Sequence, residues 1–283
     1  MRVLEEAAWR ERDREHRARL TPWTGPHLER RARGERHPVY DFLFEYYSLP
    51  AGKLLRWSPG AGCVLRGGAE GFLAAPGFRA HAEGVALDPA DFPAPRREAL
   101  EWVRSFLRAT AARPPQFGCF GLHEWAMVYR SAEVRHGAVP LRMTPEALAA
   151  FVEGQAVCCT HYDAFRFFTP EARSLNRMQP EKGRQPELDQ AGCIHVNMDL
   201  YKWAFKFAPW ISGELTADCF LLAAAAREVD MRASPYDLAA HGFPAIPIET
   251  SEGREAYAAH QRELAERGRP LRHRLLEELE ALG

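Results

Sequence analysis

Apolar side chains recur at helical spacing along much of this chain, and this pattern constrains its fold more than any other feature. In residues 97–110, for example, Leu100, Val103, Phe106 and Leu107 fall on one face of a helix. The same reasoning predicts helices in residues 2–20, 38–49, 144–154, 197–210, 211–231, 233–242 and 251–282. The sequence therefore predicts a mainly α fold.

Residues 50–95 depart from this pattern, because they hold much of the glycine and proline of the chain. Short strands or irregular loops are expected there. A buried strand is also expected in the first half of residues 155–170. A chain of 283 residues forms one large domain or two close-packed ones. We interpret residues 1–283 as a single predominantly helical domain, with 50–95 as a candidate subregion with minor strand or loop structure.

The charges of the chain are nearly balanced, with 37 lysines and arginines against 38 aspartates and glutamates and a net charge of −1. This balance argues against a generally basic coat for nucleic acid but is compatible with a local basic groove. The sequence has no long apolar run and no signal-peptide-like start, so we expect a cytoplasmic protein without a membrane partner. Its six cysteines lack zinc-ribbon spacing and are expected to be reduced. The oligomeric state is not indicated.

Reactive side chains gather with aromatic residues in three otherwise apolar windows, residues 117–130, 159–168 and 193–203. Each window contains one histidine and, within four positions, one carboxylate. The pairs are His123 with Glu124, His161 with Asp163, and His195 with Asp199. Because buried charges are costly unless they are paired or liganded, the repeated pattern indicates a functional site.

Two chemical interpretations of these windows stay open. In the first, they form a metal-dependent hydrolase or oxygenase centre, since imidazoles and carboxylates bind Zn or Fe. The candidate metal ligands are His123, Glu124, His161, Asp163, His195 and Asp199. The chain has no HExxH motif, and adjacent helical residues point about 100° apart. In the second interpretation, no cofactor is needed, because an aspartate activates water and histidines orient it.

A third interpretation is a non-catalytic helical binding protein whose buried polar residues are structural. A histidine on an apolar helix is more often a hydrogen-bonded core residue than a ligand. Asp199 and Lys202 are three residues apart, the spacing of a helical salt bridge. The aromatic residues of the windows are also typical of a core.

Four strings of the sequence resemble a known family. GCFGLHEWAMVYR, CTHYDAFRFFTPEAR, HVNMDLYKWAFK and DMRASPYDL look like a bacterial, largely actinobacterial, family described as 3-methyladenine DNA glycosylases. The resemblance runs from about Trp9 to the C-terminus. It implies hydrolysis of the N-glycosidic bond of a modified purine in DNA, or in a nucleoside or nucleotide, as part of the repair of alkylated bases.

A glycosylase needs a carboxylate that activates water and an aromatic pocket that holds the base. Asp199 or Asp163 is then the water-activating carboxylate. His161 and His195 orient the water, and Glu124 is a further catalytic candidate. The residues expected to stack on the base are Trp125, Tyr162 and Trp203. Lys202 or Arg166 is expected to contact phosphate.

Overall fold

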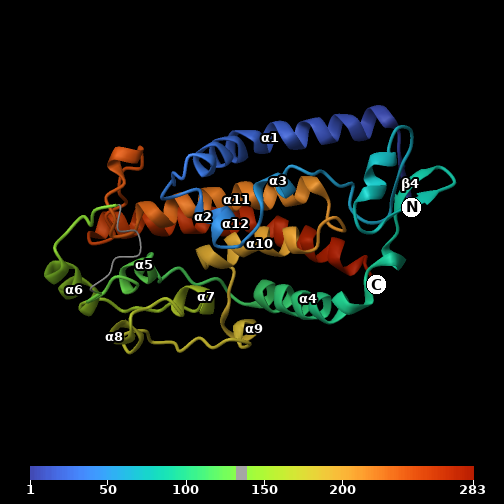
Figure 1. Ribbon diagram of the computed structural model, residues 1–283. Coiled ribbons are helices and arrows are strands. Elements are labelled where there is room, and N and C mark those ends of the chain that lie inside the picture. Colours follow the sequence, from blue (N-terminus) through green and yellow to red (C-terminus); the bar gives the residue numbers. More distant parts are fainter. Residues whose placement is uncertain (132–138) are drawn as a thin grey trace. The chain divides into compact units, whose positions relative to one another are not determined.

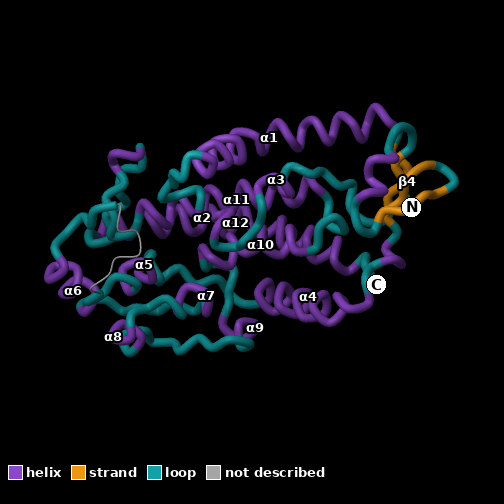
Figure 2. The backbone as a smooth tube through the Cα atoms, viewed as in Figure 1, coloured by secondary structure: helices purple, strands orange, loops and turns teal. Residues whose placement is uncertain are grey.

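The computed structural model describes residues 1–131 and 139–283, and within them the chain is mainly helical (Figure 1). Helix accounts for 56% of the structure and strand for 6% (Figure 2). Residues 50–95 supply most of the strands of one small sheet. These findings confirm the predicted mainly α fold with a minor strand element. In the described part of the chain, no helix combines the length and apolar character that a membrane crossing requires.

The chain divides into two compact units, each assembled from separate segments. Unit 1 contains Met1–Arg108, Asp199–Leu221 and Pro270–Gly283. Unit 2 contains Ala109–Met198 and Leu222–Arg269. The boundaries between the units fall inside four helices, α4 (Arg97–Ala112), α10 (Ile194–Lys206), α11 (Gly213–Arg232) and α12 (Ser251–Glu280).

Unit 1 begins with a short strand and a long charged helix, α1 (Glu6–Ala32). The buried residues of α1 recur at helical spacing, so one face of the helix packs and the arginine-rich remainder is solvated; they are Trp9, His16, Leu20, Thr24 and His27. Apart from its parts of α4, α10, α11 and α12, the other helical elements of this unit are short. They are α2 (Phe42–Glu45), α3 (Ala51–Leu54), η1 (Glu70–Ala74), η2 (Pro89–Asp91) and η3 (Ala94–Arg96).

The sheet of unit 1 has the strand order β1-β2-β4-β3. The strands are β1 (Arg2–Leu4), β2 (Cys63–Leu65), β3 (Phe78–His81) and β4 (Gly84–Leu87). β1 runs parallel to β2, whereas β4 is antiparallel to both β2 and β3. Gly84 begins β4 with a φ of +143°, and a Cβ at this position would lie 2.0 Å from the carbonyl oxygen of Leu65. Only glycine therefore lets β4 approach β2 this closely.

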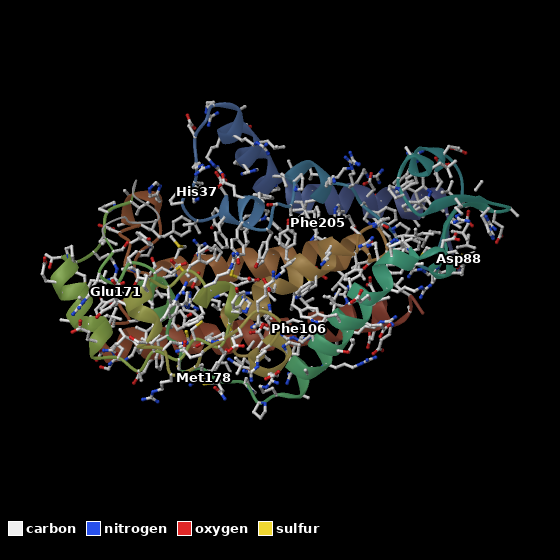
Figure 3. The ribbon with its side chains drawn as sticks, turned by 60° about the horizontal axis from the view of Figure 1, so that its bottom comes forward. His37, Asp88, Phe106, Glu171, Met178 and Phe205 are labelled. Atoms are coloured by element: carbon white, nitrogen blue, oxygen red, sulfur yellow. The ribbon has the colours of Figure 1, made fainter. Side chains whose placement is uncertain are left out.

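Aromatic residues fill the core of unit 1. Phe106 of α4 packs 5.3 Å from the ring centroid of Trp102 and 5.8 Å from that of Trp203 (Figure 3). Trp102 is partly exposed, while Phe106 and Trp203 are buried. The face of α4 predicted from the periodicity is therefore the packed face.

Unit 2 combines short helices with parts of the four helices named above. Its own helices are α5 (Leu122–Ala126), α6 (Pro145–Glu153), α7 (Tyr162–Phe165), α8 (Pro170–Arg173), α9 (Gln185–Leu188) and η4 (Ala239–His241). α6 begins as predicted, because the Thr144 side chain accepts a hydrogen bond from the backbone N–H of Ala147 at 3.3 Å. The residues of the candidate site described below belong to this unit.

Local predictions are wrong in several segments. Residues 2–4 form the strand β1 and not the start of a helix, and within the helix predicted over 38–49 only Phe42–Glu45 are α-helical. Residues 155–161 form no strand, and residues 233–242 form no helix capped by Ser234.

In residues 233–242, Tyr236 instead makes an isolated antiparallel bridge with Leu141. The neighbouring backbone N–H of Asp237 donates to the carbonyl of Pro140 at 2.8 Å. Pairing with a distant segment therefore replaces the local capping that the sequence predicted.

Candidate active site

A buried hydrogen-bond network in unit 2 joins α5 to α11. His123 on α5 donates from Nε2 to Oδ1 of Asp230 on α11 at 2.7 Å. The imidazole is the donor, because an ionised carboxylate only accepts. The other oxygen of Asp230 accepts from Arg227 at 2.8 Å, about one helical turn earlier on α11. The Asp230 carboxylate thus bridges an imidazole and a guanidinium.

Arg227 connects this pair to a second carboxylate. It donates to Oε1 of Glu124 at 2.9 Å, and both side chains are almost fully buried. His123 and Glu124 are neighbours on α5, and both reach residues of α11. Buried charges of this kind persist only when they are paired, so the four side chains form one mutually dependent cluster.

Two further imidazoles continue from His123, and we call these three side chains the imidazole row. The ring centroid of His195 on α10 lies 4.5 Å from that of His123 and 5.4 Å from that of His161. His195 Nε2 is also 3.8 Å from Oδ2 of Asp230. His161, which precedes α7, donates from Nδ1 to Asp189 at 3.2 Å. A buried carboxylate therefore pairs with the imidazole at each end of the row.

Glycine and amide contacts position the loops that carry the row. Gly121 precedes α5 with a φ of +74°, and a Cβ there would lie 3.2 Å from the Cβ of Ala233. Gln190 Oε1 accepts from the backbone N–H of Gln116 at 2.8 Å and from that of Gly192 at 2.7 Å. These bonds hold the segment before α5 against the turn that leads into α10.

The surroundings shift the pKa values of two neighbouring imidazoles in opposite directions. Burial would lower the pKa of His123, but the Asp230 carboxylate outweighs it and raises that pKa well above the usual value. Burial lowers the pKa of His195 well below its usual value, and the adjacent His123 and Arg227 add to this effect. At neutral pH, His123 is therefore protonated and His195 is neutral.

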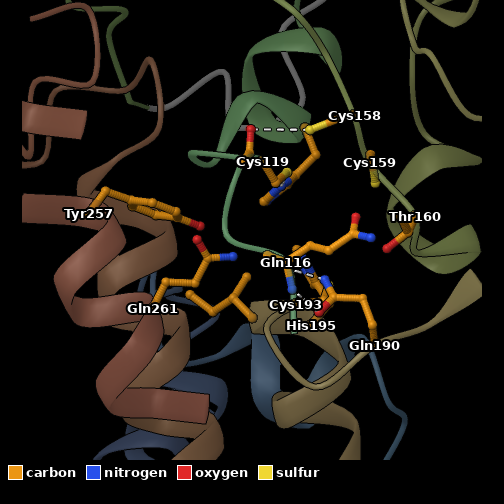
Figure 4. A pocket seen from close by; sticks show the side chains of 13 residues that line it. Gln116, Cys119, Cys158, Cys159, Thr160, Gln190, Cys193, His195, Tyr257 and Gln261 are labelled. Atoms are coloured by element: carbon orange, nitrogen blue, oxygen red, sulfur yellow. Dashed lines mark hydrogen bonds between the residues drawn. The ribbon is translucent and has the colours of Figure 1, made fainter. Parts of the chain in front are cut away.

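A partly enclosed cavity of about 70 Å³ lies beside the row (Figure 4). His123 and His195 both contribute to its wall, together with several thiols, amides and a phenol. Cys119 Sγ lies 3.6 Å from Nδ1 of His123. Burial raises the pKa of the Cys158 thiol to about 11 and that of Cys193 well above its usual value, so both thiols are uncharged at neutral pH.

The same cluster contains a candidate set of metal ligands. One ligand atom from each of His123, His195 and Asp230 lies within 4.8 Å of the other two. These ligand types suit Zn or Fe. Because His123 Nε2 and Asp230 Oδ1 are hydrogen-bonded to each other, the proton of this hydrogen bond would have to leave before both atoms could hold a metal ion.

The structure brings the three predicted histidines together in the imidazole row, and Glu124 joins them through Arg227. Other predicted residues of unit 2 have different surroundings. Asp163 of α7 forms an ion pair at 3.3 Å with Arg166, the residue that follows this helix, and Tyr162 is half-buried. Trp125 is fully buried, and its Nε1 donates to the carbonyl of Ala233 at 2.9 Å. Trp125 is therefore held as part of the core.

Three of the predicted residues, Asp199, Lys202 and Trp203, belong to unit 1. The Asp199 carboxylate accepts from the hydroxyl of Tyr47 at 2.8 Å and from Lys202 Nζ at 3.0 Å. Lys202 Nζ also lies 4.5 Å from the ring centroid of Trp203. The helical salt bridge expected from the spacing is therefore formed, and the catalytic role of Asp199 stays a prediction.

Sequence reasoning missed several members of the site. Asp230 is the first residue of the string DMRASPYDL, and Arg227 stands three residues before it, directly after the apolar run of residues 219–226. An oppositely charged pair at this helical spacing after an apolar run was the available signal. Asp189, Tyr257 and Gln261 come from polar segments in which nothing distinguishes them.

The chain matches no protein-family model, no curated protein and no solved structure.

Proposed function

We propose that this protein is a hydrolase whose reaction centre is the imidazole row of unit 2, with His195 as general base and His123 as general acid. The observation that carries the proposal is the position of these two imidazoles. Their ring centroids are 4.5 Å apart at the wall of one cavity, and a buried carboxylate holds one of them. Two neighbouring titratable groups with opposite pKa shifts are typical of an acid–base pair.

The resemblance of the four sequence strings supports an N-glycosidic bond as the bond that is hydrolysed, with a modified purine as the leaving base. A water oxygen forms a bond to the sugar C1′ while the bond from C1′ to the base nitrogen breaks. His195 accepts a proton from the water, and His123 supplies one to the departing nitrogen. One water is consumed, and the two imidazoles then exchange protons with solvent. Proton transfer by a positioned side chain contributes about 10²–10⁴-fold to such a rate.

A base-release assay tests the proposal. The full-length protein is incubated with alkylated duplex DNA and, separately, with the alkylated purine nucleoside, and free base is quantified. We expect release by the wild-type protein and a loss of about 100-fold or more in His195→Gln. His241→Gln replaces an exposed histidine of the same unit and serves as the control with unchanged release.

The outcomes separate the alternatives. Absence of release from both substrates refutes the glycosylase assignment. If base release persists in His195→Gln but is lost in Asp199→Asn, the catalytic group is Asp199, the carboxylate predicted from the sequence, and not His195. Alanine replacements at the three histidines that lower stability without changing release favour the non-catalytic role of the row.

A metal-dependent hydrolase or oxygenase is the second candidate, because one ligand atom from each of His123, His195 and Asp230 lies within 4.8 Å of the other two. Zn or Fe bound there would act as a Lewis acid or activate water or oxygen. Elemental analysis of protein purified without a nickel column decides between the candidates. About one Zn or Fe per chain that is lost in Asp230→Asn supports the metal centre, and a metal-free active protein excludes it.

A further inference from the structure

Two buried polar atoms in the cavity wall have no hydrogen-bond partner within residues 1–131 and 139–283. They are the hydroxyl of Tyr257 and Oε1 of Gln261. Tyr257 is 0% exposed and Gln261 is 1% exposed. The two residues are four positions apart on α12 and so lie on the same face of this helix. Figure 4 shows both side chains extending from α12 toward the cavity.

A second contact fixes which end of the Gln261 amide meets the cavity. Nε2 donates to the backbone carbonyl of Gly192 at 2.7 Å, and only the NH₂ end of an amide donates. Oε1 is therefore presented as an acceptor. Burial and nearby anionic groups raise the pKa of Tyr257 well above its usual value, so its hydroxyl keeps its proton and donates. The cavity wall thus offers one hydrogen-bond donor and one acceptor from the same face of α12.

Buried polar atoms are nearly always hydrogen-bonded, so an unpartnered pair at a cavity indicates a ligand group that completes it. The cavity of about 70 Å³ is roughly half the size of one that accepts benzene, about 150 Å³. It therefore admits the edge of a planar ligand more readily than a whole bicyclic base. The neighbouring thiols of Cys158 and Cys193 are uncharged and soft, which suits contact with such an edge.

We propose that Tyr257 and Gln261 bind the edge of a planar ligand in which an acceptor stands beside an N–H donor, as in an amide or the amidine edge of a 6-aminopurine. Tyr257 donates to the acceptor, and Gln261 Oε1 accepts from the N–H. The choice of a purine within this class rests on the proposed function, whereas the edge chemistry does not. His195 lines the same cavity, so a ligand bound in this way lies beside the proposed general base.

Calorimetric titration of the full-length protein with adenine and with purine tests the inference. Purine lacks the amino group that would donate to Gln261, so we expect it to bind roughly five- to tenfold more weakly than adenine. Tyr257→Phe removes only the unpartnered hydroxyl, and we expect adenine affinity to fall by a similar factor while the Tm stays unchanged or rises. A merely structural hydroxyl would give the opposite pattern, a lower Tm with unchanged binding.

Tyr201→Phe is the matched control, because Tyr201 is also fully buried with no hydrogen-bond partner for its hydroxyl in the described residues, but does not line the cavity. We expect it to leave adenine affinity unchanged. Acetamide, observed by saturation-transfer NMR, separates the two proposals because it carries the edge without the purine ring. If acetamide binds in a way that depends on Tyr257 and adenine does not bind, the inference stands and the proposed function is contradicted. If neither adenine nor acetamide binds, or if Tyr257→Phe leaves binding unchanged, the inference is overturned.

Discussion

Replacing Asp230 by asparagine tests whether the buried cluster is held together by charge. The substitution keeps the size of the side chain and removes its negative charge. In the wild-type protein, the carboxylate accepts from His123 at 2.7 Å and from Arg227 at 2.8 Å. Asparagine retains one acceptor oxygen, and its NH₂ group faces a second donor. One hydrogen bond is therefore lost, and the charges that remain are unbalanced as long as His123 keeps its proton.

The expected loss of stability follows from these contacts. Removing one partner of a buried ion pair costs about 3–5 kcal/mol. Hydrogen bonds to charged groups contribute about 1.5–3 kcal/mol each, so weakening two of them gives a similar figure. We expect Asp230→Asn to lower the free energy of unfolding by about 3–5 kcal/mol at pH 6, measured by urea denaturation.

The loss should depend on pH in a defined direction. Asp230 raises the folded-state pKa of His123, so the stability gained from this proton is fully present below the unfolded pKa of about 6.5. It is lost as the pH rises through the folded pKa of His123. The folded pKa of Asp230 itself is lowered, because the neighbouring cationic groups outweigh its burial, so its contribution is lost below about pH 4. The difference between the two proteins should therefore be largest between about pH 4 and 6.5.

Asp218→Asn is the matched control, because Asp218 lies on the same helix. Its side chain is 27% exposed, and it pairs with Arg19 at 2.6 Å and Arg274 at 2.8 Å. Exposed pairs contribute about 1 kcal/mol or less, so this variant should remain close to the wild-type protein. The reasoning is refuted if the two variants lose the same stability, or if NMR shows an unchanged pKa for His123 in Asp230→Asn.

Two further predictions concern the pH dependence of activity and the sheet of unit 1. The rate of base release should follow a bell-shaped pH profile. Its acidic limb lies below pH 6.5, because the pKa of His195 is lowered, and its alkaline limb lies above, because the pKa of His123 is raised. A profile that rises steadily with pH would contradict this assignment. Gly84→Ala should lower the free energy of unfolding by about 2 kcal/mol or more, because the added Cβ would lie 2.0 Å from the Leu65 carbonyl oxygen. Gly52→Ala should leave the free energy of unfolding unchanged or raise it, because no atom lies within 4 Å of the added Cβ. Equal urea midpoints for these two variants would show that β4 can move away from β2 to make room for a Cβ at position 84.

The helices of this protein were predictable because their apolar spacing is a local property. The face of α4 around Phe106 and the Thr144 cap of α6 both follow from residues within one or two turns. The segment after Ser234 carries an equally good local capping signal, yet Tyr236 pairs with Leu141 instead. This pairing depends on a segment about a hundred residues away, which no local pattern reports.

The candidate site shows the same limit more sharply. The three windows placed a histidine and a carboxylate close together in the sequence, and all three histidines do meet. Their carboxylate partners in the network come from further away, since His123 binds Asp230 at a sequence separation of 107 and His161 binds Asp189 at a separation of 28. The sequence identified the imidazoles by their apolar surroundings, while contacts between distant segments determined which acids reach them.

Charge balance explains why the proton resides on His123 and not on its neighbour. Arg227 contributes one positive charge to the cluster, and Glu124 and Asp230 contribute two negative charges, which leaves one negative charge in excess. An uncompensated buried charge is too costly to persist, so a nearby group must carry a further proton. His123 is hydrogen-bonded directly to Asp230, whereas His195 Nε2 lies 3.8 Å from Oδ2 of Asp230. The ring of His195 also lies next to the protonated imidazole of His123. Protonation of His123 therefore neutralises the cluster and at the same time keeps His195 neutral, which is the state that a general base requires.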